Sequence, residues 1–479
     1  MKKYLWIIVP IGLFLFLDGL VVIALLFFGL KPLVHWEVGS FIRNGRTMYR
    51  SGKMAQAISD YNWALLLDPK NSTAHYERGE SEYVLRQFDV ALADFQAAFQ
   101  ADPDNVLALL HCGLVKETEG NMTGALSDYN AAMVLQPENS YPYNYRGYAR
   151  IEQKDFTGAI ADFDQSIKLN PSDAWTYAHR AQAQARLRQY DAALADCVRA
   201  LALDPRDPVA LEYSGFCQLQ EGDFNSALAA FDHAIQHRPM QVQFYVWRGV
   251  TKIDLDDLDG AVADLTHAIG LLPNNVFALS QRGVAFRRKG DFPRSENDLT
   301  RAIEIDPANA HAYFFRGVTR YAGGNLGGAK DDFQQCADDN TEDRVYAKFW
   351  LWIVGHESGQ GLAADKDLAA FLAAYDANNP DPWNGKLGDF ITGKITLDAL
   401  LAAAVAEGTP GGQRRHQCAA LFYAGKLKLF QNDPAGARVC FAKAVATAAS
   451  DCLEYSEARR FLEMSQPAVG TDKNPDERQ

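Results

Sequence analysis

The 479-residue chain has few cysteines, and their spacing builds no recognisable site. The seven cysteines are odd in number, no two lie within ten residues of each other, and no CxxC pair occurs. This spacing excludes common zinc and redox motifs. Cys112, Cys197 and Cys336 fall at packed places of the repeating pattern described below, so we expect small core residues. Free core thiols fit a reducing compartment slightly better than an oxidising one.

The chain also lacks an excess of positive charge. It carries 47 Lys and Arg residues against 60 Asp and Glu residues, a formal net charge of −13. Nucleic acids and anionic lipids attract basic surfaces. The composition therefore disfavours both as partners.

No group of residues resembles a catalytic or metal site. His233 and His237 are four residues apart, but no HExxH arrangement surrounds them, so we expect two histidines on an exposed helix face. The glycine-rich stretch 323–328 has neither a preceding strand nor a following lysine, and we interpret it as a turn between helices. Nothing forms a nucleophile, base and orienting group. We predict no enzyme activity, no cofactor, no metal and no small-molecule substrate.

Long hydrophobic runs are absent except for one, from Leu5 to Leu30. As a helix it would reach about 39 Å, enough to cross a hydrocarbon core of about 30 Å. The run is too long for a cleavable signal peptide, no small-x-small site follows it, and no nearby cysteine suits lipidation. We predict an uncleaved signal anchor over residues 1–31. Asp18 near its middle marks either a contact with another membrane helix or a single tolerated acid.

Charges at the two ends of this run bear on its orientation. Lys2, Lys3 and the amino terminus favour a cytoplasmic N-terminus, which places the rest of the chain outside the cytoplasm. Lys31 and three arginines after the run favour the opposite orientation. We give the short N-terminal segment more weight, because large domains translocate largely regardless of their charge. A location of the repeats on the cytoplasmic side remains the alternative.

What the chain has in abundance is periodicity. Eight prolines stand 34 residues apart, at positions 69, 103, 137, 171, 205, 239, 273 and 307. Aligned on them, the units begin at residues 38, 72, 106, 140, 174, 208, 242, 276 and 310. The eighth place is glycine in eight of the nine units, the twentieth is alanine in eight, and the twenty-fourth is bulky in eight. Such a period predicts a helical repeat array.

The columns suggest how one unit folds. Small residues at the eighth and twentieth places let two helices approach closely, and the bulky residue fills the space beside them. Proline ends the second helix, because it lacks an N–H group. The pattern resembles the tetratricopeptide repeat over residues 38–343 and 418–451. The resemblance implies an all-α, right-handed superhelical solenoid of nine helix hairpins, with function on its concave face.

Two charged columns accompany this pattern. Arginine stands at the seventh place of six units, and each of the six carries aspartate at the twenty-third place. We predict an ion pair between the two helices of each unit, worth roughly 3–5 kcal/mol if buried and about 0–1 kcal/mol if exposed. A row of anion-binding arginines is the alternative. The sixth unit lacks both residues, and Asp60 and Asp128 have no arginine at the seventh place. The six pairs are Arg78–Asp94, Arg146–Asp162, Arg180–Asp196, Arg248–Asp264, Arg282–Asp298 and Arg316–Asp332.

Beyond the ninth unit the strict period lapses. Residues 344–417 read as an irregular helical segment, 418–466 as a final repeat with a capping helix, and 467–479 as a disordered tail. Within these segments we expect helices at 344–357, 362–375, 397–405 and 453–464, a turn-rich joint at Pro380, Pro382 and Trp383, and a loop at 408–412.

The C-terminal third has a second resemblance. The order WIVG, Trp383, FITGKITLDALL (390–401) and LFYAGKLKL (421–429), followed by a closing repeat, is similar to the NlpI-type bacterial envelope lipoproteins. Those proteins are adaptors built from tetratricopeptide repeats. The resemblance implies a bacterial envelope protein, although this chain has no lipidated cysteine and more regular repeats.

The first helix of each unit offers a candidate binding surface. Places 2, 5, 9 and 12 share one stripe by helical spacing, and in this chain the stripe is rich in aromatic residues. The lysine and asparagine with which some family members hold a C-terminal carboxylate are absent from the fifth and ninth places. We predict an apolar groove for an extended or helical protein segment; packing between units is the alternative. The groove residues are Tyr76, Tyr141, Tyr148, Trp175, Phe216, Phe277 and Phe314.

Together these features predict a membrane-anchored scaffold that binds protein partners in the bacterial envelope. The expected location is the inner membrane, crossed once, with the repeats in the periplasm. A structural or assembly subunit of a membrane complex, held through the anchor and Asp18, is the alternative.

Overall fold

The computed structural model describes residues 31–338, 343–375, 382–406, 410–449 and 452–465, and every regular element among them is an α-helix. The predicted anchor up to residue 30, its Asp18 and the predicted tail from residue 467 lie outside the described residues. None of the helices in the described ranges combines the length and the hydropathy that a membrane span requires.

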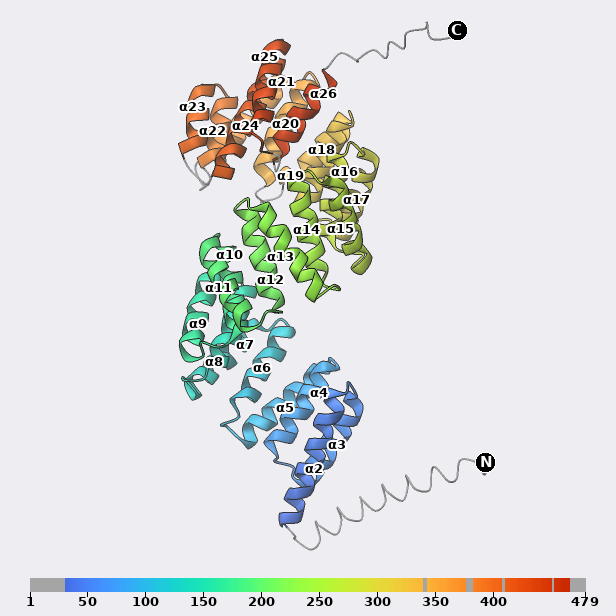
Figure 1. The fold of residues 1–479 in the computed structure, drawn as a ribbon, viewed down its shortest axis with the longest axis vertical. Coiled ribbons are helices and arrows are strands. Elements are labelled where there is room, and N and C mark those ends of the chain that lie inside the picture. Colours follow the sequence, from blue (N-terminus) through green and yellow to red (C-terminus); the bar gives the residue numbers. More distant parts are fainter. Residues whose placement is uncertain (1–30, 339–342, 376–381, 407–409, 450–451, 466–479) are drawn as a thin grey trace, which may run out of the picture. The chain divides into compact units, whose positions relative to one another are not determined.

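Residues 31–338 form nine consecutive helix hairpins (Figure 1). The first helices of the hairpins are α2 (Lys31–Arg50), α4 (Ser72–Val84), α6 (Val106–Thr118), α8 (Ser140–Glu152), α10 (Ala174–Arg186), α12 (Pro208–Gln220), α14 (Val242–Asp254), α16 (Val276–Arg288) and α18 (Ala310–Ala322). The second helices are α3 (Met54–Leu67), α5 (Phe88–Ala101), α7 (Met122–Leu135), α9 (Phe156–Leu169), α11 (Tyr190–Leu203), α13 (Phe224–His237), α15 (Leu258–Leu271), α17 (Phe292–Ile305) and α19 (Leu326–Asp338).

Local chemistry explains where the helices begin and end. Each of the eight second helices from α3 to α17 ends two residues before a repeat proline. Asn or Asp caps most of the first helices; Asn71, for example, accepts a hydrogen bond from the Ala74 N–H group. In all nine hairpins the fifteenth place has a left-handed backbone, with φ between 60° and 85°. Glycine occupies five of these places, because it adopts positive φ without strain.

The glycines at the eighth place are required by close packing inside each hairpin. A Cβ atom on Gly113 would lie 2.4 Å from the Tyr129 ring, and one on Gly215 would lie 2.6 Å from the Phe231 ring. Both rings are fully buried. The predicted contact between the small and the bulky column is therefore what closes each hairpin.

The chain divides into two compact units, Met1–Pro205 and Arg206–Gln479, each of which is described by itself. In the first unit α6 touches α8 and α8 touches α10; in the second α12 touches α14, α14 touches α16 and α16 touches α18. Among the described residues, no comparable contact joins successive second helices. Within each unit successive first helices are thus packed more closely than successive second helices. The stack of repeats therefore curves toward the first helices, which line its concave side.

The C-terminal region continues with seven helices in the described ranges. They are α20 (Asp343–Glu357), α21 (Gly361–Tyr375), α22 (Pro382–Ile391), α23 (Leu397–Ala406), α24 (Pro410–Phe430), α25 (Pro434–Ala446) and α26 (Leu453–Met464). They enclose a large core with Trp350, Phe349 and Phe422 at its centre.

Three local predictions are wrong, two in the C-terminal region and one in the ninth repeat. Trp383 lies in helix α22 rather than in a joint, and its ring stacks on His416 at 4.2 Å between centroids. Residues 410–412, predicted as loop, begin helix α24, because proline is favoured in a first helical turn. Gly327 and Gly328 belong to α19 rather than to a turn. Proline and glycine mark a helix start as readily as a break, and the sequence pattern does not separate the two.

The last helix contacts more than the closing repeat. Besides packing on α24 and α25, α26 reaches back to the repeats of the second unit. Glu457 accepts a hydrogen bond from Arg287 of α16 at 2.7 Å, and both side chains are almost fully buried. Arg460 donates to the Ala322 carbonyl oxygen at the end of α18 at 3.3 Å. The C-terminal helix is therefore fixed to repeat 8 by a buried ion pair and to repeat 9 by a hydrogen bond.

Candidate protein-binding groove

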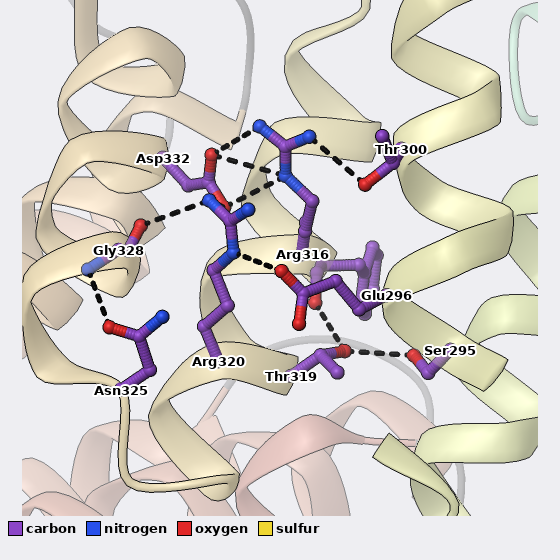
Figure 2. A network of polar contacts seen from close by, with 10 residues as sticks. Ser295, Glu296, Thr300, Arg316, Thr319, Arg320, Asn325, Gly328 and Asp332 are labelled. Carbon is purple, nitrogen blue, oxygen red and sulfur yellow. Dashed lines mark hydrogen bonds and ion pairs between the residues drawn. The ribbon is translucent and has the colours of Figure 1, made fainter. Parts of the chain in front are cut away.

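The structure confirms the Arg–Asp ladder. In each of the six predicted pairs the arginine donates from Nε and Nη2 to the aspartate of its own hairpin; Arg248, for example, lies 2.8 and 2.5 Å from the two Asp264 oxygens. The aspartate side chains are at most 9% exposed. Figure 2 shows the last pair, in which Arg320 also donates to Asp332, so that two arginines surround one carboxylate.

The third guanidinium nitrogen links neighbouring repeats. Arg78 Nη1 donates to Asn62 Oδ1, and Arg316 Nη1 donates to Thr300 Oγ1, in each case sixteen residues earlier and in the second helix of the preceding repeat. All six ladder arginines make this second contact. The ladder thus joins helices within a repeat and repeats to one another.

These contacts answer the question of the arginines' role. The hydrogen bonds that Arg180 donates to Asp196 raise the pKa of Arg180, and burial opposes this effect. Burial raises the pKa of Asp94, but hydrogen bonds from Arg78 and His75 outweigh it and hold that pKa below its ordinary value. The guanidinium donors face aspartates rather than an open surface, so the alternative of an anion-binding row is wrong. Asp128, which lacks an arginine at the seventh place, accepts instead from Lys116 Nζ at 2.7 Å.

Three of the predicted groove residues meet in one pocket of the first unit. Tyr141, Tyr148 and Trp175 come from α8 and α10, and α6 adds Leu114 and Glu117. The pocket has a volume of about 360 Å³. Tyr141 is 52% exposed and Trp175 is 37% exposed, an unusual exposure for large aromatic side chains on helices whose other faces are packed.

The other four predicted groove residues have different surroundings. Tyr76 packs on Phe95 and His111, with ring centroids 5.7 and 5.2 Å away. Phe314 is only 5% exposed and packs on Phe333 at 5.8 Å. Phe314 is therefore a core residue rather than a groove residue. For this residue the alternative of packing between units is confirmed.

In the second unit Phe216 and Phe277 are joined by a ring that the sequence analysis did not name. Trp247 lies between them, with centroids 5.1 Å from Phe216 and 5.4 Å from Phe277. Phe277 remains 39% exposed. The three rings form an aromatic cluster on the first helices α12, α14 and α16.

Trp247 belongs to a column that sequence reasoning missed. The sixth place of the units carries a ring in six of nine cases, which was a visible signal. In the first unit Tyr145 lines the pocket, and His179 stacks on Trp175 at 3.8 Å. The six are His111, Tyr145, His179, Tyr213, Trp247 and Phe315.

The pocket of the first unit is acidic as well as aromatic. Its lining comprises Leu114, Glu117, Tyr141, Asn144, Tyr145, Tyr148, Asp173 and Trp175, with two carboxylates and no basic side chain. Glu117 accepts a hydrogen bond from the Tyr129 hydroxyl at 2.9 Å. Burial raises the pKa of Glu117, and the charge of Glu152 adds to that effect while the Tyr129 hydrogen bond opposes it.

A polar network holds the floor of this pocket. Asn144 Nδ2 donates to Asp173 Oδ2 at 2.9 Å, and the Thr176 hydroxyl donates to the same oxygen at 2.7 Å. Asp173 Oδ1 also caps α10 by accepting from the Trp175 N–H group. Burial raises the pKa of Tyr145 and Tyr148, so both phenols are neutral near pH 7. The network fixes α8 against α10 and thereby orients Trp175.

No catalytic or metal-binding arrangement accompanies this pocket in the described ranges. His233 and His237 face each other with ring nitrogens 3.1 Å apart on an exposed helix face. Nowhere in that part of the chain do three potential metal ligands come together. Burial lowers the pKa of His179 to about 4, so this ring is neutral at physiological pH.

Comparison with protein families identifies the repeats. The tetratricopeptide repeat model matches residues 42–86, 81–140, 143–208 and 281–342. A search of the curated proteins finds no match. The family model's matches end at residue 342, so the resemblance of the C-terminal third to NlpI-type lipoproteins stays a prediction.

Solved structures with a similar chain path include three of different origin. A tetratricopeptide repeat protein from Parabacteroides merdae is 18% identical, with 52% of this chain and 98% of that chain covered and a TM-score of 0.44. PilF from Pseudomonas aeruginosa is 18% identical, with 44% and 96% covered and a TM-score of 0.39. Human IFIT1, solved as a dimer with m7Gppp-AAAA, is 13% identical, with 79% and 90% covered and a TM-score of 0.49. From its own periodicity, its hairpins and the family match, this chain contains an array of tetratricopeptide repeats.

Proposed function

We propose that this protein is a non-catalytic scaffold that holds a segment of a protein partner against α6, α8 and α10. One observation carries the proposal: Tyr141, Tyr148 and Trp175 converge on an open pocket, while the core of the α8–α9 hairpin is already filled by the Phe163 ring. Exposed aromatic side chains that cluster in a pocket are typical of the residues that dominate binding energy in protein interfaces.

The proposal includes a membrane tether and a place in the bacterial envelope. Both rest on the apolar run of residues 5–30 and on the resemblance of the C-terminal third to envelope adaptors. In this arrangement the anchor concentrates the repeats at the inner membrane, and the pocket selects the partner on its periplasmic side.

Replacing Tyr141, Tyr148 and Trp175 together by alanine is expected to abolish capture of the partner. The experiment isolates the full-length protein from cells in mild detergent after cross-linking and compares the proteins that co-purify. Each lost anchor removes about 2 kcal/mol or more of binding free energy if it is a dominant contact, so the combined loss exceeds a thousandfold in affinity.

A matched control replaces Val134 and Val198 by alanine. These valines are 82% and 68% exposed on the second helices α7 and α11 of the same unit, so the control removes exposed apolar area from the opposite side. We expect the control to keep the partner. If the aromatic variant folds, as judged by circular dichroism, and still captures the same proteins, this groove is not where they bind.

A further inference from the structure

We propose that the pocket of the first unit binds a basic side chain, Lys or Arg, on the partner's segment. The inference rests on the proposed function and deepens it, because it names the chemistry of the group that enters the pocket. Four aromatic rings and two carboxylates converge there, and none of the lining residues is basic.

The aromatic side chains supply one half of the recognition. Cations are attracted to the faces of Trp and Tyr rings within about 6 Å of the ring centre. Tyr148 lies 6.0 Å from Trp175 between centroids, with the two planes inclined at 45°. Tyr141 and Tyr145 complete the wall from the same helix, α8. The pocket volume of about 360 Å³ accommodates one long side chain rather than a folded element.

The carboxylates supply the other half. Glu117 is partly buried, and the hydrogen bond that it accepts comes from a neutral phenol, Tyr129. Two cationic residues on α6 and α8 are engaged elsewhere: Lys116 contacts Asp128, and Arg150 contacts Asp162. His179, which stacks on Trp175, is neutral because burial lowers its pKa to about 4. A half-buried carboxylate beside a second acid is stabilised by an incoming cation. Glu152, which ends α8, adds a further negative charge near Glu117.

The surroundings argue against an apolar side chain as the preferred occupant. A methyl-rich group in this pocket would desolvate Glu117 further without neutralising it, at a cost in free energy. A guanidinium or ammonium group uses both the rings and the carboxylates, and its aliphatic stem covers Leu114. The net charge of −13 favours the approach of a basic segment to the chain as a whole.

The test uses the full-length protein in detergent with 5-fluorotryptophan in place of tryptophan. The fluorine signal of Trp175 is assigned with the Trp175→Phe variant. Acetylated pentapeptides Ala-Ala-X-Ala-Ala are titrated, with X as arginine, lysine, citrulline or norleucine. We expect the arginine and lysine peptides to shift the Trp175 signal with an affinity about fivefold or more above that of the neutral peptides.

Two charge-matched variants complete the experiment. Glu117→Gln keeps an acceptor for the Tyr129 hydroxyl and is expected to remove most of the preference for the basic peptides. Glu119→Gln removes the same charge from the exposed residue that caps the C-terminal end of α6, two positions after Glu117, and is expected to leave the preference unchanged. Equal loss in both variants would reveal a long-range charge effect and overturn the assignment of Glu117.

The other outcomes separate this inference from the proposed function. If the norleucine peptide binds as tightly as the arginine peptide, the pocket is an apolar anchor site; the inference fails and the groove function stands. If no peptide shifts the Trp175 signal at millimolar concentration, the inference fails as well. In that case partner capture by the variant with alanine at positions 141, 148 and 175 decides the groove function independently.

Discussion

Replacing Glu457 by alanine is expected to lower the free energy of unfolding of the second unit by about 3–5 kcal/mol. Glu457 accepts from Arg287 at 2.7 Å and from Arg460 at 2.9 Å, and its side chain is 3% exposed. Burial lowers the pKa of Arg287, and the charge of Glu457 counteracts that effect. Without the carboxylate, a guanidinium that is 4% exposed retains only the Ser456 hydroxyl, at 3.4 Å.

Urea titration of tryptophan fluorescence measures this effect, because Trp350 and Trp352 lie in the adjoining core. Arg459→Met, two residues further along α26, is the control: Arg459 is half exposed and pairs with exposed acids, so the change should cost less than about 1 kcal/mol. The double variant Arg287→Met with Glu457→Met is expected to regain most of the loss, because it removes both charges of the buried pair. Arg460 also loses its partner Glu457, but its side chain is 29% exposed and still donates to the Ala322 carbonyl oxygen. A double variant as unstable as Glu457→Ala would contradict this explanation.

The second large effect concerns the Arg–Asp ladder. Arg282→Met is expected to lower the local stability of its repeat by about 3–5 kcal/mol, because it leaves Asp298, 9% exposed, without a cation. Arg248→Met in the preceding repeat is expected to cost only about 1.5–3 kcal/mol. The difference arises because Lys252 Nζ lies 2.8 Å from Asp264 and remains there when Arg248 is removed.

Hydrogen exchange resolves these two changes repeat by repeat, since a repeat array opens locally as well as globally. We expect faster exchange in α16 and α17 for Arg282→Met than in α14 and α15 for Arg248→Met. Equal acceleration in the two variants would show that Lys252 does not stabilise the Asp264 carboxylate. No acceleration in either variant would mean that the ladder does not stabilise the stack.

The hairpins and the ladder could be predicted because each depends on contacts within one 34-residue period. The spacing of sixteen residues between Arg248 and Asp264 recurs in six units, and this recurrence supports a contact between the two side chains in each unit. The lysine beside Asp128, Lys116, was missed because it stands at the eleventh place rather than the seventh. From the eleventh place its side chain still extends across the hairpin to the aspartate at the twenty-third place. A column of charges therefore predicts a pair better than it predicts which cation fills it.

The groove was predicted less completely, for a physical reason. Helical spacing places Tyr148, Trp175 and Phe314 on comparable faces, yet it does not tell how closely the next repeat packs. The ring of Phe314 is covered and that of Trp175 is not. The contact between α26 and α16 was also out of reach, because Arg287 and Glu457 are 170 residues apart and no repeat pattern relates them.

Hydrogen exchange of the full-length protein with and without its captured partner is the most direct test of the central claim, that the first-helix side of the repeats holds another protein. We expect slower exchange in α6, α8 and α10 upon binding, with α7 and α9 unchanged. Slower exchange confined to the second helices, with no change around Tyr148 and Trp175, would contradict it.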